Sequence, residues 1–267
     1  MPEAPPLTLE LALRVESLVG KGLLQNARNE RGPSRASTEV FGSTVAIKAK
    51  SGRTRNDVLC FGLDDLPMLD AILDFYASDA LEPRFYLSPM RFHPTLGSEL
   101  AKRGFGQTRF EQAILYGAAA ETPVQLPPSI SIERVRADTL DEYLQALGDG
   151  FEWHEDWRDS ALMGIRRTFG EDSRWYLARF EGEPTAVGSI SVPEEGAASL
   201  GGAAVVPRFR RMGLHTALLW HRLHEAHLLG CALVTGSAHI QTSSYANQQR
   251  AGLRLAYVES QWERLPK

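Results

Sequence analysis

Three arginines and a glycine stand where small apolar residues give way to a long helical pattern. The stretch is GGAAVVPRFRRMGLHTALLWHRLHEAHLLG, residues 201–230, and its charged and flexible members are Arg208, Arg210, Arg211 and Gly213. A helix N-terminus exposes unpaired N–H groups with partial positive charge, and glycine lets an oxyanion approach them closely. The pattern therefore predicts a phosphate cradle formed by residues 211–216. The alternative is a packing glycine beside solvated arginines.

The overall charge of the chain does not attract anions, so a phosphate would have to be bound by the groups of this junction alone. The chain of 267 residues has a formal net charge of −4, which gives no electrostatic reason to expect a nucleic acid or an anionic membrane as partner. Its first residues lack the basic and apolar segments of a secretory signal, and no apolar run approaches the roughly 20 residues that span a bilayer. We therefore expect a cytoplasmic protein with Cys60 and Cys231 as free, buried thiols.

A proline-rich break divides the chain. In GAAAETPVQLPP, residues 117–128, the periodic hydrophobicity stops and three prolines disfavour a helix or a central strand. This break predicts an N-terminal domain of residues 1–117, a linker of residues 118–128 and a C-terminal domain of residues 129–267.

Hydrophobic periodicity predicts a mixed α/β arrangement of packed layers. In the N-terminal half we expect strands at 38–50, 58–62, 84–87 and 107–116, and helices at 64–80, opening with an Asp cap, and at 94–103. In the C-terminal half we expect strands at 129–135, 173–180, 184–192, 198–206, 231–237 and 253–262, and helices at 138–147, 156–168, 211–229 and 243–251.

The strand-to-helix junction resembles the signature of the GNAT superfamily of N-acetyltransferases, V-x-P-x-x-R-x-x-G-x-G/A. Its positions here hold Val205, Pro207, Arg210, Gly213 and, in place of the usual second small residue, His215. A second stretch, TSSYANQQRAGLRLAYVESQW at 242–262, resembles the family's helix that closes in a glycine turn before a strand. The resemblance covers residues 129–264 and implies a GNAT fold in this half.

This resemblance implies that acetyl-CoA lies in a gap where the strands at 198–206 and 231–237 splay apart. In such members the pantetheine amides pair with the fourth strand, and the pyrophosphate lies on the start of the following helix. The residues thereby assigned to cofactor binding are Ala204, Val205, Val206, Arg210, Arg211, Met212, Gly213, Leu214, His215, Thr216 and Asn247. The imidazole of His215 can donate a hydrogen bond to the pyrophosphate or crowd it.

The acid for the leaving thiolate departs from the family pattern. The tyrosine that protonates the thiolate in many members is Gln248 here. Tyr245, about one turn earlier, is the candidate substitute, and the alternative is that its ring only packs. Because a thiol has a pKa of about 8.5, water can also suffice as the proton donor.

The proton acceptor must come from outside the fourth strand, because AASLGGAAVV holds no carboxylate. The loop that usually lines the acceptor pocket in the family offers Glu152, His154, Glu155 and Asp156 beside Trp153 and Trp157. Acids next to aromatic rings suit a cationic amine with an apolar body. The alternative is a solvated acidic loop with core tryptophans.

A metal site is not expected. His221, His224 and Glu225 share one face of the predicted helix, but no second ligand cluster accompanies them. The apolar Leu219 and Leu223 lie elsewhere on the helix, so this face is predicted to be solvated.

The N-terminal half shows no Arg/Gly phosphate cradle. Its stretch LGSELAKRGFGQTRFEQAIL nevertheless echoes YANQQRAGLRLAYVESQW, since each predicts a helix, a glycine turn and a strand. The echo indicates a degenerate GNAT-like copy, and the alternative is an unrelated α+β cap.

The C-terminal half has room for only one strand after its second motif, whereas GNAT domains commonly close the sheet with a hairpin. An open sheet edge is an aggregation hazard. We therefore expect the strand at 107–117 or its neighbours to pair with or cover the C-terminal sheet, which would make the N-terminal half structural.

Two functions of different class remain. The first, which we prefer, is an acetyl-CoA-dependent N-acetyltransferase acting on a primary amine of a small molecule or a peptide. The second is a non-catalytic acyl-CoA-binding or sensing protein that keeps the cradle and has lost the acid and the base. The loop of acids and aromatics favours the first, and Gln248 favours the second. The sequence identifies neither the acceptor amine nor an oligomeric state.

Overall fold

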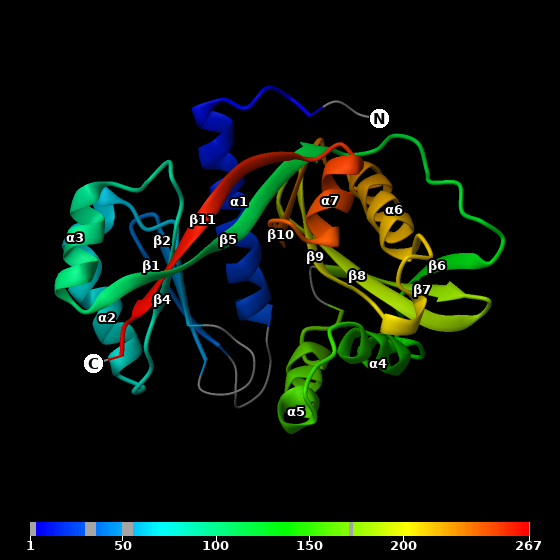
Figure 1. Cartoon of the computed structure of the whole chain (residues 1–267), viewed down its shortest axis with the longest axis horizontal. Helices are drawn as coiled ribbons and strands as arrows, with labels where there is room; N and C mark the ends of the chain where they lie inside the picture. Colours follow the sequence, from blue (N-terminus) through cyan, green and yellow to red (C-terminus); the bar gives the residue numbers. More distant parts are fainter. Residues whose placement is uncertain (1–3, 30–35, 50–55, 171–172, 267) are drawn as a thin grey trace.

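The computed structural model describes residues 4–29, 36–49, 56–170 and 173–266, and within them one mixed sheet of eleven strands runs through both halves of the sequence (Figure 1). The N-terminal half contains α1 (Leu9–Asn29), β1 (Ser37–Phe41), β2 (Thr44–Lys48), β3 (Asp57–Leu59), η1 (Leu63–Met68), α2 (Leu69–Ala77), β4 (Arg84–Leu87), α3 (Pro94–Lys102) and β5 (Phe105–Ala118). The C-terminal half contains β6 (Ile130–Arg134), α4 (Leu140–Gly150), α5 (Glu155–Arg166), β7 (Ser173–Phe180), β8 (Glu183–Glu194), β9 (Ala197–Val205), η2 (Pro207–Phe209), α6 (Leu214–Leu228), β10 (Leu233–His239), α7 (Ser243–Arg250) and β11 (Arg254–Arg264). The predicted mixed α/β class is confirmed.

Both halves repeat one order of elements. In each, three antiparallel strands lead to a helix, a strand parallel to the third, a second helix and a final strand. The glycines before the two final strands, Gly104 and Gly252, both have positive φ, at 82° and 92°. This repeated order supports the duplicated fold that the sequence echo predicts.

The final strands of the two halves are exchanged. The strand order is β1-β2-β3-β4-β11-β5-β10-β9-β8-β7-β6. β5 therefore lies between β10 and β11, with Ala113 opposite Ala238 on one side and opposite Val258 on the other. β11 continues onto β4, where Ser260 stands opposite Leu87. The prediction that the 107–117 strand joins the C-terminal sheet is confirmed.

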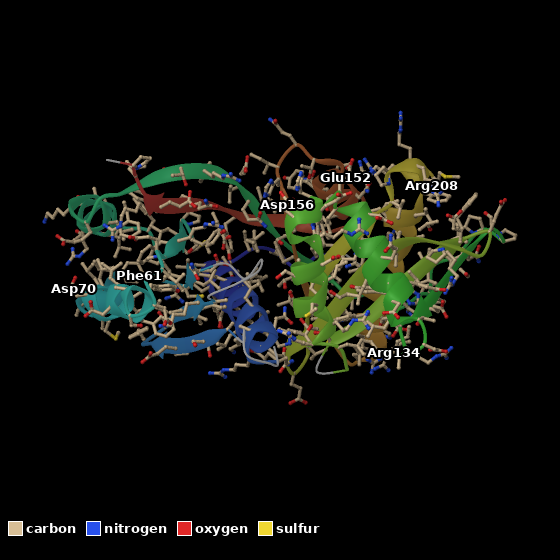
Figure 2. All side chains as sticks on the ribbon, turned by 90° about the horizontal axis from the view of Figure 1, so that it is seen from below. Phe61, Asp70, Arg134, Glu152, Asp156 and Arg208 are labelled. Carbon is tan, nitrogen blue, oxygen red and sulfur yellow. The ribbon has the colours of Figure 1, made fainter. Side chains whose placement is uncertain are left out.

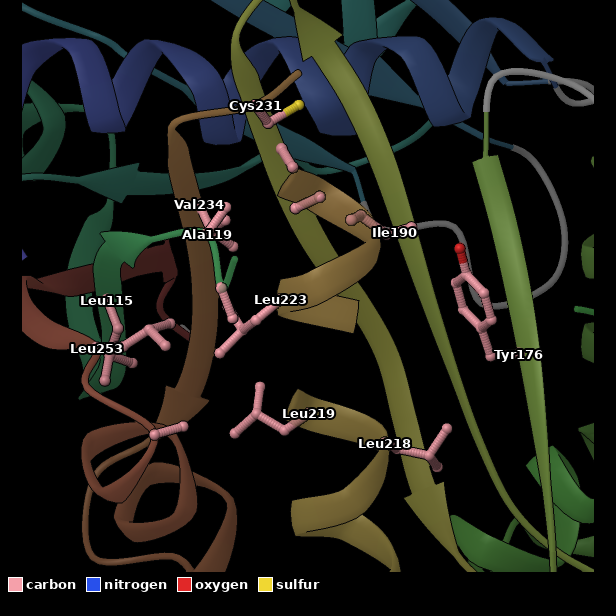
Figure 3. Packing of buried hydrophobic residues seen from close by; sticks show 14 of the residues in the cluster. Leu115, Ala119, Tyr176, Ile190, Leu218, Leu219, Leu223, Cys231, Val234 and Leu253 are labelled. Carbon is pink, nitrogen blue, oxygen red and sulfur yellow. The ribbon is translucent and has the colours of Figure 1, made fainter. Parts of the chain in front are cut away.

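Two helices cover opposite faces of the C-terminal sheet. Leu219 and Leu223 project from α6 toward β10, and Leu218 projects toward Tyr176 on β7 (Figure 3). Leu177, the neighbour of Tyr176 along β7, instead packs in the cluster of α4, because successive residues of a strand face opposite sides. Each buried leucine contributes about 1.5–3 kcal/mol, so these contacts hold α6 firmly on one face.

Residues 9–29, for which the sequence pattern predicts no element, form the long helix α1. Two interior glycines lower the helix propensity of this segment, and Glu16 interrupts its apolar stripe. Glu16 is only 4% exposed; it accepts a hydrogen bond from the Ser88 hydroxyl and pairs with Arg91, both at 2.5 Å. A buried, fully paired carboxylate thus anchors α1 to the N-terminal half.

Two predicted helix starts differ from the structure. α6 begins at Leu214 and not at 211, because Arg211 and Gly213 adopt left-handed φ angles of 67° and 81°. The expected Asp cap at the start of the 64–80 helix is also wrong. There the chain forms η1, and the Asp65 carboxylate accepts a hydrogen bond from the Thr44 hydroxyl.

Both cysteines are free and buried, as predicted. Burial raises the pKa of the Cys60 thiol to about 12, so this sulfur stays protonated and unreactive at neutral pH. In the described part of the chain, none of the helices combines the length and the apolar character needed to cross a bilayer.

The exchange of final strands predicts that the C-terminal half cannot fold alone. A fragment of residues 129–267 loses β5 from between β10 and β11 and exposes two unpaired strand edges. We expect this fragment to be insoluble or to lack a cooperative thermal transition by circular dichroism, and co-expression with residues 1–128 to restore one. A soluble fragment that unfolds cooperatively near the melting temperature of the full chain would contradict this.

Candidate functional site

A gap opens between β9 and β10 in the middle of the sheet. The two strands pair in parallel at only three positions, from Ala197 opposite Leu233 to Ser199 opposite Thr235. Beyond Ser199 the described residues of β9 and β10 have no mutual register, although both strands continue. The splay predicted for these strands is therefore present, and it leaves one edge of β9 without a partner strand.

The N-terminus of α6 lies at the end of this gap. Its N-cap is Gly213, and nothing lies within 4 Å of the position that a Cβ on this residue would take. Within the described residues, the main-chain N–H groups of 211–216 donate no hydrogen bond. Six main-chain donors without a partner thus lie at the positive end of a helix, with open space beside Gly213, and this arrangement suits an anion.

Two of the three arginines at the junction are engaged elsewhere. Arg210 lies 2.6 Å from the Glu152 carboxylate and also donates to the last carbonyl of α4. Arg208 pairs with Glu183. Arg211 is exposed and has a positive φ. Its side chain pairs with no other side chain in the described part of the chain, so it is the arginine that remains available to an anion.

His215 faces α7. Its Nδ1 lies 3.0 Å from the amide nitrogen of Asn247, whose oxygen in turn accepts a hydrogen bond from Arg250. Burial, with a smaller contribution from Arg222, lowers the pKa of His215 to about 4, so the ring is neutral at pH 7. His215 and Asn247, two of the residues predicted to bind the cofactor, therefore contact each other and join the start of α6 to α7.

Gln248 occupies the floor of the gap. Its side chain is 6% exposed and donates at 3.1 Å to the carbonyl of Ser237, at the end of β10. Its Oε1 is buried, has no hydrogen-bond partner in the described part of the chain, and would collide with a Cβ at Gly236. Gly236 and Ser237 both face the cavity described below. Gln248 thus presents an unsatisfied acceptor beside the splayed strands.

Tyr245 lies away from this floor. Its hydroxyl accepts a hydrogen bond from the Gln249 amide at 3.1 Å, and its ring packs on the cluster beneath α6. Like Gln248 and residues 211–216, it is not among the residues that line the cavity, so its role as an acid stays a prediction.

A cavity of about 530 Å³ lies between the two halves and continues into the gap. Its walls come from α1, β2, β3 and β4 on one side and from α4, α5, β8 and β9 on the other. Aromatic rings line it at Tyr86, Tyr143, Phe151, Trp153 and Trp175, and hydroxyls line it at Ser160, Ser173, Ser189, Ser191, Ser199 and Ser237. The carboxylates of Asp57 and Glu259 are the charged groups among the described lining residues, which include no Lys, Arg or His.

The loop acids predicted as proton acceptors lie outside this lining. Glu152 pairs with Arg210, and His154 caps α5 by accepting from the N–H of Asp156 at 3.4 Å. Glu155 is exposed, and Figure 2 shows Glu152 and Asp156 along the same edge as Arg208. Trp153 alone of residues 152–156 lines the cavity; the side chain of Trp157 lies outside the described part.

The histidine-rich face of α6 is less solvated than predicted. His221 packs edge-on against the ring of Tyr176, and Glu225 accepts a hydrogen bond from the Tyr176 hydroxyl at 2.9 Å. The described residues contain no group of three potential metal ligands. This face therefore joins α6 to β7.

Known proteins resemble both the C-terminal half and the whole chain. Residues 132–249 match the model of the acetyltransferase (GNAT) family. Among solved structures, the chain is similar to a GCN5-related N-acetyltransferase from Kribbella flavida, at 15% identity and a TM-score of 0.67 over 94% of this chain and 96% of that one. It is also similar to a tandem GNAT protein from the clavulanic acid biosynthesis pathway, at 12% identity and a TM-score of 0.64 over 97% and 96% of the two chains. No curated protein matches the chain.

The buried, neutral His215 predicts a loss of stability at mildly acidic pH. In the unfolded chain its pKa returns to about 6.5, so between pH 6.5 and the folded value of about 4 the unfolded state binds a proton that the folded state does not. The free energy of unfolding should therefore fall as the pH drops through this range, by up to about 3 kcal/mol. Denaturant unfolding at pH 7 and pH 5 measures the effect.

His215→Gln keeps an acceptor for Asn247 and removes the titrating group, so the difference between pH 7 and pH 5 should shrink. His227→Gln, at an exposed position of the same helix, is the matched control and should keep the wild-type difference. Equal pH dependence in wild type and His215→Gln would show that His215 is not the responsible group.

Proposed function

We propose, from the premise that residues 132–249 are a GNAT acetyltransferase domain, that this protein transfers an acetyl group from acetyl-CoA to a primary amine of a small molecule or a peptide. The observation that supports the proposal is the arrangement of groups along the β9–β10 gap. The free N–H groups of 211–216 follow the end of β9, and the cavity between the halves reaches the gap at Gly201, Gly202 and 235–237. Such an arrangement suits a long ligand with an anionic end and a reactive end.

Several features of the gap fit an acyl-CoA. The free N–H groups of residues 211–216 and the side chain of Arg211 suit the pyrophosphate. The edge of β9 that has no partner strand beyond Ser199 suits the pantetheine amides, with Ala204 near its end. The Val205 carbonyl already accepts a hydrogen bond from Arg210, and Val206 follows the end of β9. When bound, the co-substrate supplies an activated thioester, whose carbonyl carbon is the acetyl donor. His215 and Asn247 serve here by fixing the start of α6.

The acceptor amine enters the cavity between the halves. Its ammonium pairs with the carboxylates of Asp57 and Glu259, and its apolar body packs on the surrounding aromatic rings. An amine must lose its proton before it can attack a carbonyl, and one of these carboxylates accepts that proton directly or through water. Asp57 belongs to the N-terminal half, which on this proposal contributes to the acceptor site as well as to the sheet.

A non-catalytic acyl-CoA sensor is the second candidate, favoured by the absence of a tyrosine at position 248. The leaving thiolate needs no strong acid, because a thiol pKa of about 8.5 makes water a sufficient proton donor. Turnover with amines distinguishes the two: the sensor binds CoA without releasing an acetyl group to any amine.

Substitution at Gly213 tests the cradle. Because Gly213 has φ of 81°, the matched pair Gly213→Asn and Gly213→Asp is informative: both side chains tolerate this conformation, and they differ mainly in charge. A carboxylate beside the pyrophosphate should weaken CoA binding at least tenfold more in Gly213→Asp than in Gly213→Asn. Isothermal titration calorimetry measures both. Equal dissociation constants in the two folded variants would remove the cradle from the site.

Neutralising the cavity carboxylates tests the acceptor side. Asp57→Asn or Glu259→Gln should lower kcat/KM for the amine by about 10² or more if that carboxylate takes the proton, with CoA affinity unchanged. Release of CoA from acetyl-CoA across a panel of amines is the assay. Glu152→Gln, which lies outside the cavity, is the control. Full activity in both cavity variants would refute their role.

A further inference from the structure

Arg222 on α6 is a buried cation without an anionic partner. It is 2% exposed and donates to main-chain carbonyls only: Nε to Leu218 at 3.1 Å, and Nη1 to Ser189 at 3.1 Å and to Gly201 at 3.0 Å. Burial lowers its pKa to about 10, so it remains protonated at neutral pH. Within the described part of the chain, no carboxylate forms an ion pair with it. Burying an uncompensated charge is costly, so the arrangement calls for a function.

The sheet is shaped to receive this guanidinium. A Cβ on Gly188 of β8 would lie 3.0 Å from both Cζ and Nε of Arg222. Any side chain at this position would displace the arginine, whose planar head sits where a residue of β8 would normally project toward α6. Arg222 is therefore inserted against the backbone of β8 and β9.

The Ser189 and Gly201 carbonyls, which accept hydrogen bonds from Arg222, lie next to a β-bulge. Between the matched pairs Ser189 with Gly201 and Val187 with Ala204, β9 has two residues and β8 has one. Gly202, the first extra residue, has φ of 41° and lines the cavity. Bulges re-aim backbone groups and are frequent beside active sites.

The geometry of one peptide unit links Arg222 to the cavity. Described peptide bonds are all trans, so the N–H of Gly202 points opposite to the C=O of Gly201. Because that carbonyl points toward Arg222 and β8, the Gly202 N–H points away from them, toward the side where β9 no longer pairs with β10 after Ser199. It is therefore aimed into the gap at the level of the cavity.

We propose that Arg222 is a positioning residue for acyl transfer: by holding the Gly201 carbonyl it directs the Gly202 N–H at the thioester oxygen and strengthens that N–H as a donor. This rests on the proposed function. The amine nitrogen bonds to the thioester carbon, its proton passes to a cavity carboxylate, and the carbon–sulfur bond breaks with its electron pair leaving on sulfur. Negative charge on the thioester oxygen rises and falls during this exchange. A polarised, fixed N–H stabilises that charge, as preorganised donors do in acyl transfer.

The test uses the infrared band of the thioester carbonyl in [1-¹³C]acetyl-CoA bound to the full chain, read as an isotope difference spectrum. In the wild type the band should lie at lower wavenumber than in free acetyl-CoA, because the hydrogen bond weakens the C=O bond. Arg222→Met should lose more than half of this shift while calorimetry gives a CoA dissociation constant within about threefold of wild type, since the 211–216 cradle is untouched. Arg222→Lys, which keeps a charge and a donor, should retain part of the shift.

Arg174→Met is the matched control, because Arg174 joins the same helix through Glu225 without touching β9. It should keep the full shift. If Arg222→Met does not fold, Arg222→Gln provides the same comparison. Tight acetyl-CoA binding with an unshifted carbonyl band, or a shift that survives loss of Arg222, overturns the role of Arg222 and leaves the proposed function standing. Failure of the wild type to bind acetyl-CoA overturns both.

Discussion

The pairing of β5 with both β10 and β11 is the interaction on which the rest of the molecule depends. It places a strand from the N-terminal half inside the C-terminal sheet and, through β11 and β4, a strand from the C-terminal half inside the other. The two halves are consequently parts of one sheet and cannot separate without breaking central ladders. Their fixed separation creates the cavity, whose walls come from both. β5 covers the outer edge of β10, and the cavity reaches the β9–β10 gap on the other side of that strand.

The two copies of the repeat have diverged in the place where a ligand would bind. In the C-terminal copy the strands β9 and β10 splay and leave free N–H groups at the start of α6. In the N-terminal copy β3 and β4 pair only at their starts, and Glu16 reaches from α1 to the Ser88 hydroxyl just past β4. The N-terminal segment that corresponds to residues 211–216 is the start of η1, which carries Asp64 and Asp65. These carboxylates would repel an anion. The C-terminal copy therefore keeps a gap with free N–H groups, while the N-terminal copy contributes lining residues to the shared cavity.

The sequence predicted the C-terminal elements closely, because strands such as Ser173–Phe180 carry a clear hydrophobic pattern and Gly213 sits at a recognisable strand-to-helix junction. It did not predict α1, whose buried face includes Glu16. Nor did it identify Asp57 and Glu259, which are isolated acids in the sequence and line the same cavity only because β11 joins β4. Arg222 was missed for a similar reason. In a helix with several histidines a basic residue is expected to be solvated, and only the packing of α6 on β8 and β9 shows that it is buried. Local hydrophobic patterns determine where helices and strands form, whereas the positions of these site residues depend on contacts between distant parts of the chain.

The most direct test of the proposed site is a crystal structure of the full chain with CoA bound. We expect the pyrophosphate against the N–H groups of residues 211–216, the pantetheine arm along the free edge of β9, and the sulfur at the mouth of the cavity beside Gly202. CoA density in any other cleft, or a β9–β10 gap that stays free of CoA at saturating concentration, would contradict it.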